Sequence, residues 1–258
     1  MNEKILVVIP YCSAGAQGRE LEYAVAGWRR HFKEDYLIVL AGEDHPITKT
    51  GDDICCVPSR RVPPRDGQYR QHLDYVSCFK KVRDAFPESK GFIFVADDVY
   101  AVHDFDMTDV LAQKKIGEIA LIPTPVGGWR GDQQRTRAKL LEDGYSIHNY
   151  TTHLPQYFEW EKLAALWERY HMDTESYVFE DLYYNIYFGD RLAVNVHTDG
   201  QPYKCGIYRS NPDIYAIERA FINRIWITNS PEGWVPQLDR MLNQYYFNSG
   251  TWTWTWNT

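Results

Sequence analysis

The amino-acid sequence predicts an α/β fold in which a mixed sheet is flanked by helices. Short apolar runs rich in Val, Ile and Phe recur through the first 100 residues, as buried strands require. Between them lie longer stretches with apolar residues three and four positions apart, which is the spacing of amphipathic helices. Strands that alternate with helices predict an open, doubly wound sheet with parallel neighbours.

The first half of the chain opens with a β-α-β pattern and adds two more strands. In the fourth strand, Phe92 and Phe94 alternate with Ile93 and Val95, so both faces are apolar. This pattern predicts a central strand that is covered on both sides. The expected strands are 4–10, 35–42, 52–58 and 91–98, and the expected helices are 21–32 and 69–86.

The second half is less regular, and we expect it to complete the same single domain over residues 1–258. The expected halves are 1–125 and 126–258, the second of which ends in a C-terminal tail. The tail, TWTWTWNT, alternates strictly and predicts a strand with its tryptophans on one face. The other expected elements are a strand at 118–125, a Gly- and Arg-rich connection at 127–139, helices at 158–171 and 176–190, and a strand at 191–198.

Composition narrows the possible partners and location. The net charge is −7 and no tract rich in Lys or Arg occurs, which argues against nucleic-acid binding. No apolar run reaches the roughly 18 residues of a membrane span, and the N-terminus lacks a secretory pattern. The five cysteines form an odd set without a C-x-x-C pair, which predicts a reducing, cytoplasmic setting.

Two adjacent acids, Asp97 and Asp98, end the fourth predicted strand. Ligands of open α/β sheets bind outside the carboxyl ends of the strands, where these acids are expected. Carboxylate oxygens are the ligands that Mg²⁺ and Mn²⁺ prefer, so the pair is a candidate cation site. The alternative interpretation is a turn or a helix cap, because Asp often begins the element that follows a strand.

The order of motifs resembles that of GT-A-fold glycosyltransferases, which use nucleotide-sugar donors. The resemblance rests on the opening strand ILVVIPY, the acid-ended strand FIFVADDVY with its D-x-D-like element, the later FED, and VNVHTDG near the end. It covers about the first 200 residues and implies a GT-A-like (Rossmann-like) domain, with a nucleotide-binding half at 1–125 and an acceptor-side half at 126–258. It also implies a hexosyl transfer assisted by Mn²⁺ or Mg²⁺. The FIFVADDVYAV stretch also resembles the sugar-phosphate transferases of the Stealth type.

The resemblance assigns the metal ligands residue by residue. Ala96 stands where the family has its first acid, and Asp98 matches the direct metal ligand, while Asp97 is expected to take over part of the missing role. His197 in VNVHTDG matches a second protein ligand, and an imidazole ligand favours manganese over magnesium. The alternative for His197 is an exposed histidine at a strand end.

A second acidic pair, Glu180 and Asp181, resembles the acids on the acceptor side of inverting members of the fold. An acceptor hydroxyl has a pKa far above 7, so a carboxylate must take its proton as the new bond forms. Asp181 is the first choice for this base and Glu180 the second. Alternatively, both acids occupy the first turn of a helix because the helix dipole favours them there.

Donor contacts are expected from two loops. Arg60, Arg61 and Arg65 follow the third predicted strand, and guanidinium groups match pairs of phosphate oxygens, so they are expected to bind the diphosphate. The family resemblance implies that Tyr11, at the end of the first strand, packs against the nucleobase and ribose.

The predicted function is therefore transfer of a hexosyl group from a nucleoside-diphosphate sugar, with a UDP-sugar favoured, to a hydroxyl acceptor such as a carbohydrate. Two alternatives remain open. A sugar-phosphate transferase or nucleotidyltransferase would use the same acids and cation but release a different product. A non-catalytic carbohydrate-binding protein would need neither Asp98 nor Asp181.

Overall fold

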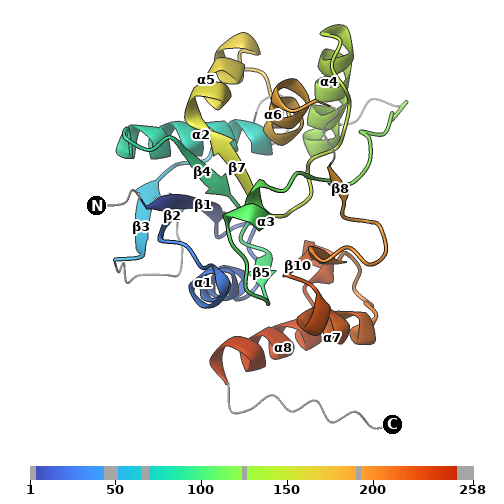
Figure 1. Cartoon of the computed structure of the whole chain (residues 1–258). Helices are drawn as coiled ribbons and strands as arrows, with labels where there is room; N and C mark the ends of the chain where they lie inside the picture. Colours follow the sequence, from blue (N-terminus) through green and yellow to red (C-terminus); the bar gives the residue numbers. More distant parts are fainter. Residues whose placement is uncertain (1–3, 44–51, 65–69, 124–126, 190–192, 249–258) are drawn as a thin grey trace. The chain divides into compact units, whose positions relative to one another are not determined.

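The computed structural model describes residues 4–43, 52–64, 70–123, 127–189 and 193–248 (Figure 1). The chain forms two compact units built from interleaved segments, and each unit draws on both of the halves expected from the sequence. The first unit comprises Met1–Ala14, Glu34–Ala96 and Asp106–Gln201, and the second comprises Gly15–Lys33, Asp97–Phe105 and Pro202–Thr258.

A five-stranded mixed sheet organises the first unit, with the strand order β3-β2-β1-β4-β7. Strands β1 to β4 are parallel to their neighbours in this order, and β7 is antiparallel to β4. The predicted mixed α/β sheet with parallel strands in the N-terminal half is thereby confirmed. Its strands are β1 (Ile5–Cys12), β2 (Tyr36–Glu43), β3 (Ile54–Pro58), β4 (Gly91–Phe94) and β7 (Gln156–Glu159).

Strand β4 is central, as its two apolar faces predict. It pairs with β1 on one side, where Leu6 faces Phe92 and Val8 faces Phe94, and with β7 on the other. All four residues of β4 are buried. The carboxyl ends of the parallel strands lie at one edge of the sheet, which is where open α/β sheets bind ligands.

Five helices and a short strand pair complete the described part of the first unit. Helix α2 packs against β2 and β3, and α4 packs against both α2 and α6. Helix α5 follows β7 directly and packs against it and against α6 (Figure 1). The helices are α2 (Gln71–Ala85), α3 (Met107–Leu111), α4 (Gly128–Glu142), α5 (Trp160–Arg169) and α6 (Phe179–Tyr187), and the pair is β6 (Lys114–Lys115) with β8 (Val194–Asn195).

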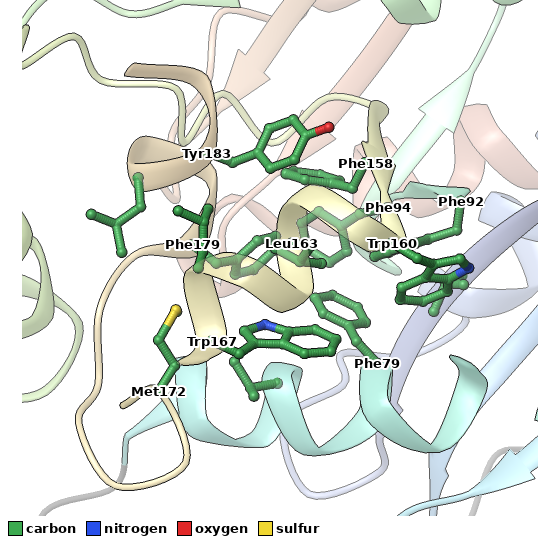
Figure 2. Packing of buried hydrophobic residues seen from close by; sticks show 14 of the residues in the cluster. Phe79, Phe92, Phe94, Phe158, Trp160, Leu163, Trp167, Met172, Phe179 and Tyr183 are labelled. Carbon is green, nitrogen blue, oxygen red and sulfur yellow. The ribbon is translucent and has the colours of Figure 1, made fainter. Parts of the chain in front are cut away.

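Aromatic rings dominate the core of this unit (Figure 2). Phe92 of β4 stacks on Trp160 of α5 with ring centroids 4.2 Å apart. Phe179, the first residue of α6, lies against Phe79 at 5.1 Å and against Phe158 at 5.2 Å. Burying such large rings contributes a major share of core stability, and it seats the first residue of α6 firmly on the sheet.

The second unit has its own three-stranded sheet, with the order β5-β10-β9. Strand β10 is antiparallel to β5 and parallel to β9. The core of the unit contains Tyr23, Tyr100, Ile227, Leu238 and Leu242. Its elements are α1 (Glu20–His31), β5 (Val99–Ala101), β9 (Lys204–Ile207), α7 (Ile214–Asn223), β10 (Trp226–Asn229), the 3₁₀ turn η1 (Pro231–Gly233) and α8 (Pro236–Phe247).

Two predicted elements of the second half are wrong. The described residues 118–123 form no strand and contribute only one isolated bridge, between Glu118 and His148. The predicted connection at 127–139 is helix α4 instead. Gly127 and Gly128 suggested a loop, but Gly128 begins the helix with a φ of +58°, and the Arg, Gln and Lys residues that follow are good helix formers.

Other predicted boundaries need correction. The strand expected at 91–98 ends at Phe94, and β5 begins at Val99 in the other sheet. The helix expected at 158–171 begins at Trp160, because Phe158 and Glu159 pair with β4. The strand expected at 191–198 is reduced to β8, and its first two residues lie outside the described part of the chain. The TWTWTWNT tail also lies outside it.

Two further observations bear on the sequence predictions. Within the described residues, no helix combines the length and the apolar character that crossing a bilayer requires. All five cysteines lie in described residues, and none is in a disulfide.

Candidate functional site

The acidic pair Asp97 and Asp98 lies in the second unit, in the turn that leads into β5. Both residues are partly exposed, whereas Val95 before them and Val99 after them are buried. The backbone N–H of Asn229 in β10 donates to the carbonyl oxygen of Asp98 at 3.4 Å. The pair therefore lies on an ordered turn, with each residue partly exposed and partly buried.

A buried hydrogen-bond network lies beside this turn. The Asn229 side chain donates from Nδ2 to Oε1 of Glu20 at 2.7 Å and accepts at Oδ1 from the Tyr100 hydroxyl at 2.6 Å. The other oxygen of Glu20, Oε2, accepts from the backbone N–H of Gln17 at 2.6 Å. Glu20 is therefore held in place by both oxygens, and it adds a third carboxylate to the neighbourhood of Asp97 and Asp98.

The charges in this neighbourhood repel one another. Burial, together with the charge of Glu20, raises the pKa of Asp97 to about 7. Burial and the charges of Asp97 and Glu20 raise the pKa of Asp98 well above its ordinary value. The buried Lys204 of β9 opposes this effect, since its charge lowers the pKa of Asp98. A bound cation would relieve the same repulsion, because it favours the ionised carboxylates.

The donor set fits a divalent cation held mainly by its substrate. Among the described residues, no group of three or more His, Cys, Asp or Glu is placed to hold a metal ion. Asp97 and Asp98 can supply two carboxylates. Mg²⁺ commonly binds through one or two carboxylates and takes its remaining ligands from phosphate and water. The pair is therefore suited to a cation that arrives with a diphosphate.

The second acidic pair, Glu180 and Asp181, lies in the first turn of α6 in the first unit. Helix α4 anchors the segment that enters this helix. Ser176 donates from its hydroxyl to Oδ2 of Asp132 at 2.5 Å, and the backbone N–H of Val178 donates to Oγ1 of Thr136 at 2.8 Å. Both α4 side chains are fully buried. Helix α4, which the sequence analysis did not predict, thus positions Glu180 and Asp181, which it did predict as site residues.

Asp181 faces inward and has a structural partner. Its exposed fraction is 0%, and Oδ1 accepts the backbone N–H of Tyr150 at 2.6 Å. One turn later, Asn185 donates to the carbonyl oxygen of His148 at 2.8 Å and accepts its N–H at 2.9 Å. Asp181 and Asn185 together hold the segment 148–150. In this conformation an acceptor substrate cannot reach the Asp181 carboxylate, because the side chain is fully buried.

Glu180 points to a different partner and retains some exposure, 6%. Its Oε2 lies 3.8 Å from Nδ1 of His72, the second residue of α2. Burial and the charge of Asp181 raise the pKa of Glu180 to about 8. A carboxyl whose pKa is raised toward neutrality is suited to general acid–base chemistry. This placement favours Glu180 over Asp181 as the candidate base.

The burial of Asp181 should make the unfolding free energy of the chain depend on pH. Burial raises the pKa of this carboxyl to about 8, against about 4 in an unfolded chain. The folded state therefore holds the proton more tightly, and stability should fall as the pH rises from about 5 to about 8. Asp181→Asn keeps an oxygen that can accept from Tyr150 but cannot titrate. We expect its unfolding free energy, measured by urea denaturation, to fall less steeply than that of the wild type.

Asp181→Ala provides the matched comparison. It removes the acceptor of a buried N–H, so it should lower the unfolding free energy by about 1–3 kcal/mol relative to Asp181→Asn at about pH 7. If the unfolding free energy of Asp181→Asn falls with pH as steeply as that of the wild type, the raised pKa of the Asp181 carboxyl would be contradicted.

The other predicted site residues that the structure describes lie in the first unit. Tyr11 is the penultimate residue of β1 and is 9% exposed. Arg60 and Arg61 follow β3 and are exposed, and Arg60 Nε lies 4.0 Å from Oε1 of Glu43. His197 is exposed in the turn after β8. Arg65 lies outside the described residues.

Several residues of these clusters escaped the sequence analysis. In the second unit they are Glu20, Lys204 and Asn229, and in the first unit they are His72 and Asp132. None belongs to a local motif, because each contacts its partner across a long stretch of chain. Glu20 and Asn229, for example, are 209 positions apart. The sequence offers one signal for Glu20, its position as an acid in the first turn of a predicted helix.

A separate pocket of about 450 Å³ lies in the first unit, between α2, α5 and the turn after α5. None of the predicted site residues lines it. Its wall mixes both signs of charge, and Lys80, which lies 5.5 Å from the centre of the Trp167 ring, is paired with Asp173.

Comparison with known proteins gives partial likenesses only. Neither a protein-family model nor a curated protein sequence matches the chain. The apo structure of the bifunctional glycosyltransferase WbbM matches with a TM-score of 0.43 and 11% identity, over 88% of this chain and 46% of that one. A glycosyltransferase involved in glycosylation of the major capsid of PBCV-1 matches with a TM-score of 0.41 and 12% identity, over 92% and 97%.

The apo-form glycosyltransferase GlyE of Streptococcus pneumoniae TIGR4 matches with a TM-score of 0.38 and 14% identity, over 95% of this chain and 60% of that one. This chain therefore spans less than two thirds of the length of WbbM and of GlyE. All three proteins are glycosyltransferases, the class that the sequence resembles. At these scores the backbones superpose only in part, so the function proposed next rests on the residues of this chain.

Proposed function

We propose that this chain is a GT-A-type glycosyltransferase that moves a hexosyl group from a nucleoside-diphosphate sugar, with a UDP-sugar favoured, to an acceptor hydroxyl. The observation that carries the proposal is the adjacent pair Asp97 and Asp98, which follows the carboxyl end of the buried central strand β4 along the chain. We place the reaction in the cytoplasm, as the odd number of cysteines predicts.

In the second unit, Asp98 and Asp97 would hold Mn²⁺ or Mg²⁺ through their carboxylate oxygens. When bound, such a cation neutralises charge that builds on the departing diphosphate. The repulsion among Asp97, Asp98 and Glu20 supports this assignment, because a bound cation would offset the negative charge that gathers at this turn.

In the first unit, Glu180 accepts the proton of the acceptor hydroxyl. Its raised pKa supports this role, while Asp181 orients the first turn of α6 through Tyr150. Arg60 and Arg61 would bind phosphate oxygens of the donor, and both residues are exposed. Arg65 shares this proposed role, and Tyr11 the proposed contact with the nucleoside.

Product analysis tests the proposal. The chain would be incubated with Mn²⁺, a panel of simple sugar acceptors, and UDP-glucose, UDP-galactose or GDP-mannose in turn. The nucleotide products would be separated by ion-exchange chromatography. We expect release of UDP or GDP together with a glycosylated acceptor identified by mass spectrometry.

Other products would favour the alternatives. Release of a nucleoside monophosphate with transfer of a sugar phosphate would indicate a sugar-phosphate transferase, and release of pyrophosphate from a nucleoside triphosphate would indicate a nucleotidyltransferase. Sugar binding without turnover of any donor would indicate a carbohydrate-binding protein.

A further inference from the structure

Two buried polar side chains in the first unit face each other without completing a hydrogen bond. His72 of α2 is 2% exposed and Glu180 of α6 is 6% exposed. Within the described part of the chain, neither ring nitrogen of His72 has a hydrogen-bond partner, and neither does Oε2 of Glu180. The nearest pair of atoms, Nδ1 and Oε2, is 3.8 Å apart. A shift of about 1 Å would make it a hydrogen bond.

Packing alone does not explain a histidine at this position. The ring of His72 meets those of Tyr75 and Phe179 edge to face, with centroids 5.7 Å and 5.9 Å apart. A phenylalanine or leucine would fill the same space without burying two nitrogens, and a buried polar group without a hydrogen bond lowers stability. Such a cost is tolerated where the polar atoms serve a purpose.

Burial keeps the imidazole neutral, and a neighbouring charge adds to the effect. Burial, together with the charge of Arg135 of α4, lowers the pKa of His72 to about 3. Arg135 is itself paired with Asp132 of the same helix. On α6, the charge of Asp181 acts on Glu180. A neutral imidazole still carries one N–H, and the partner that this N–H finds decides which nitrogen holds it.

We propose that His72 is the positioning residue of Glu180, with its Nδ1–H donating a hydrogen bond to Oε2 of the ionised carboxylate. The bond fixes the orientation of the carboxylate and leaves Oε1 to receive the acceptor proton. The assignment of Glu180 as base rests on the function proposed above. The contact between His72 and Glu180 is a property of the first unit by itself.

The proton and the electron pairs balance in this scheme. As the acceptor oxygen bonds to the anomeric carbon, its O–H bond breaks and the proton passes to Oε1 of Glu180. The bond between the anomeric carbon and the phosphate oxygen breaks, and its electron pair leaves with the diphosphate. His72 keeps its single N–H throughout. Glu180 afterwards returns the proton to solvent.

Nitrogen-15 NMR of histidine-labelled protein tests the contact without any substrate. At about pH 9, where Glu180 is ionised because its pKa is about 8, we expect neutral His72 to carry its proton on Nδ1, and Glu180→Leu to move that proton to Nε2. A wild-type His72 protonated on Nε2, or a tautomer that Glu180→Leu leaves unchanged, would overturn the proposal. The wild-type spectrum decides the matter even if the variant folds poorly.

The pH dependence of transfer tests the role of the contact. Removing a hydrogen bond to an ionised carboxylate raises its pKa, so His72→Leu should move the ascending limb of the pH–rate profile up by about one pH unit. The rate at about pH 7 should then fall about tenfold. His72→Asn, whose amide N–H₂ can occupy the place of Nδ1, should restore the wild-type profile. If the pH–rate profile of His72→Leu is the same as that of the wild type, the proposal is overturned.

The two measurements separate this inference from the proposed function. An Nδ1 proton that depends on Glu180, in a protein that transfers no sugar, would leave the contact intact and refute the glycosyltransferase. Sugar transfer with the proton on Nε2 would support the enzyme and refute the contact.

Discussion

Replacing Glu180 with glutamine should lower the rate of hexosyl transfer by about 10²–10⁴-fold, the usual contribution of a positioned general base. The amide has nearly the shape of the carboxyl but cannot accept the acceptor proton. Because Glu180 is assigned to the acceptor step and not to donor binding, the affinity for nucleotide should stay unchanged. Steady-state rates with saturating donor, together with calorimetric nucleotide binding, measure both quantities.

Glu175→Gln is the matched control for this variant. Glu175 precedes α6 by a few residues and is exposed, so the same chemical change should leave the rate close to that of the wild type. Thermal unfolding of Glu180→Gln would show that the fold is retained. A Glu180→Gln enzyme that transfers sugar at the wild-type rate would remove Glu180 from the mechanism.

The sheet of the first unit could be predicted because its signals are local. Apolar residues on both faces predict strand β4, and runs of Val, Ile and Leu predict β1 and β2. Parallel pairing follows from the helical stretches between these strands. The fourth strand was predicted too long because Val95 and Ala96 continue the apolar run, although the chain leaves the sheet after Phe94.

Helix α4 could not be predicted because distant contacts stabilise it. Its start carries Gly127, Gly128 and Gly131, which signal a loop. Its buried polar residues, Asp132 and Thr136, meet Ser176 and Val178 more than 40 positions later in the chain. An amphipathic pattern is weak in such a helix, because polar side chains occupy part of its buried face.

The sequence predicts the acids of the candidate site, but it does not predict which residues surround them. Adjacent carboxylates at 97–98 and 180–181 stand out in the sequence, and the structure places one pair in each unit. Which acid of the second pair is accessible depends on Tyr150, 31 positions before Asp181, and on His72 of another helix. No pattern in one sequence carries that information.

Asp98→Ala should have the other large effect, a loss of metal-dependent nucleotide affinity of about 100-fold, or about 2.7 kcal/mol. Asp98 supplies one of two proposed carboxylate ligands in the turn before β5, and alanine leaves the cation with Asp97 as its acid in that turn. The turn itself should persist, because Asn229 bonds to the backbone carbonyl of Asp98 and not to its side chain.

Asp35→Ala is the control for the change in net charge. Asp35 is exposed and precedes β2, and its carbonyl oxygen accepts from Ile5 at the opposite end of the strand from the carboxyl edge. Nucleotide binding by this variant should match the wild type, with and without the cation.

Calorimetric titration of UDP and of GDP, each with and without Mn²⁺, into the wild type and Asp98→Ala tests the central claim most directly. We predict that one nucleotide, UDP in preference to GDP, binds the wild type only when Mn²⁺ is present, and that Asp98→Ala loses this binding while Asp35→Ala keeps it. Failure of both nucleotides to bind the wild type under every condition, or equal metal-dependent binding by Asp98→Ala, would contradict the claim that this acid pair holds a cation for a nucleotide-sugar donor.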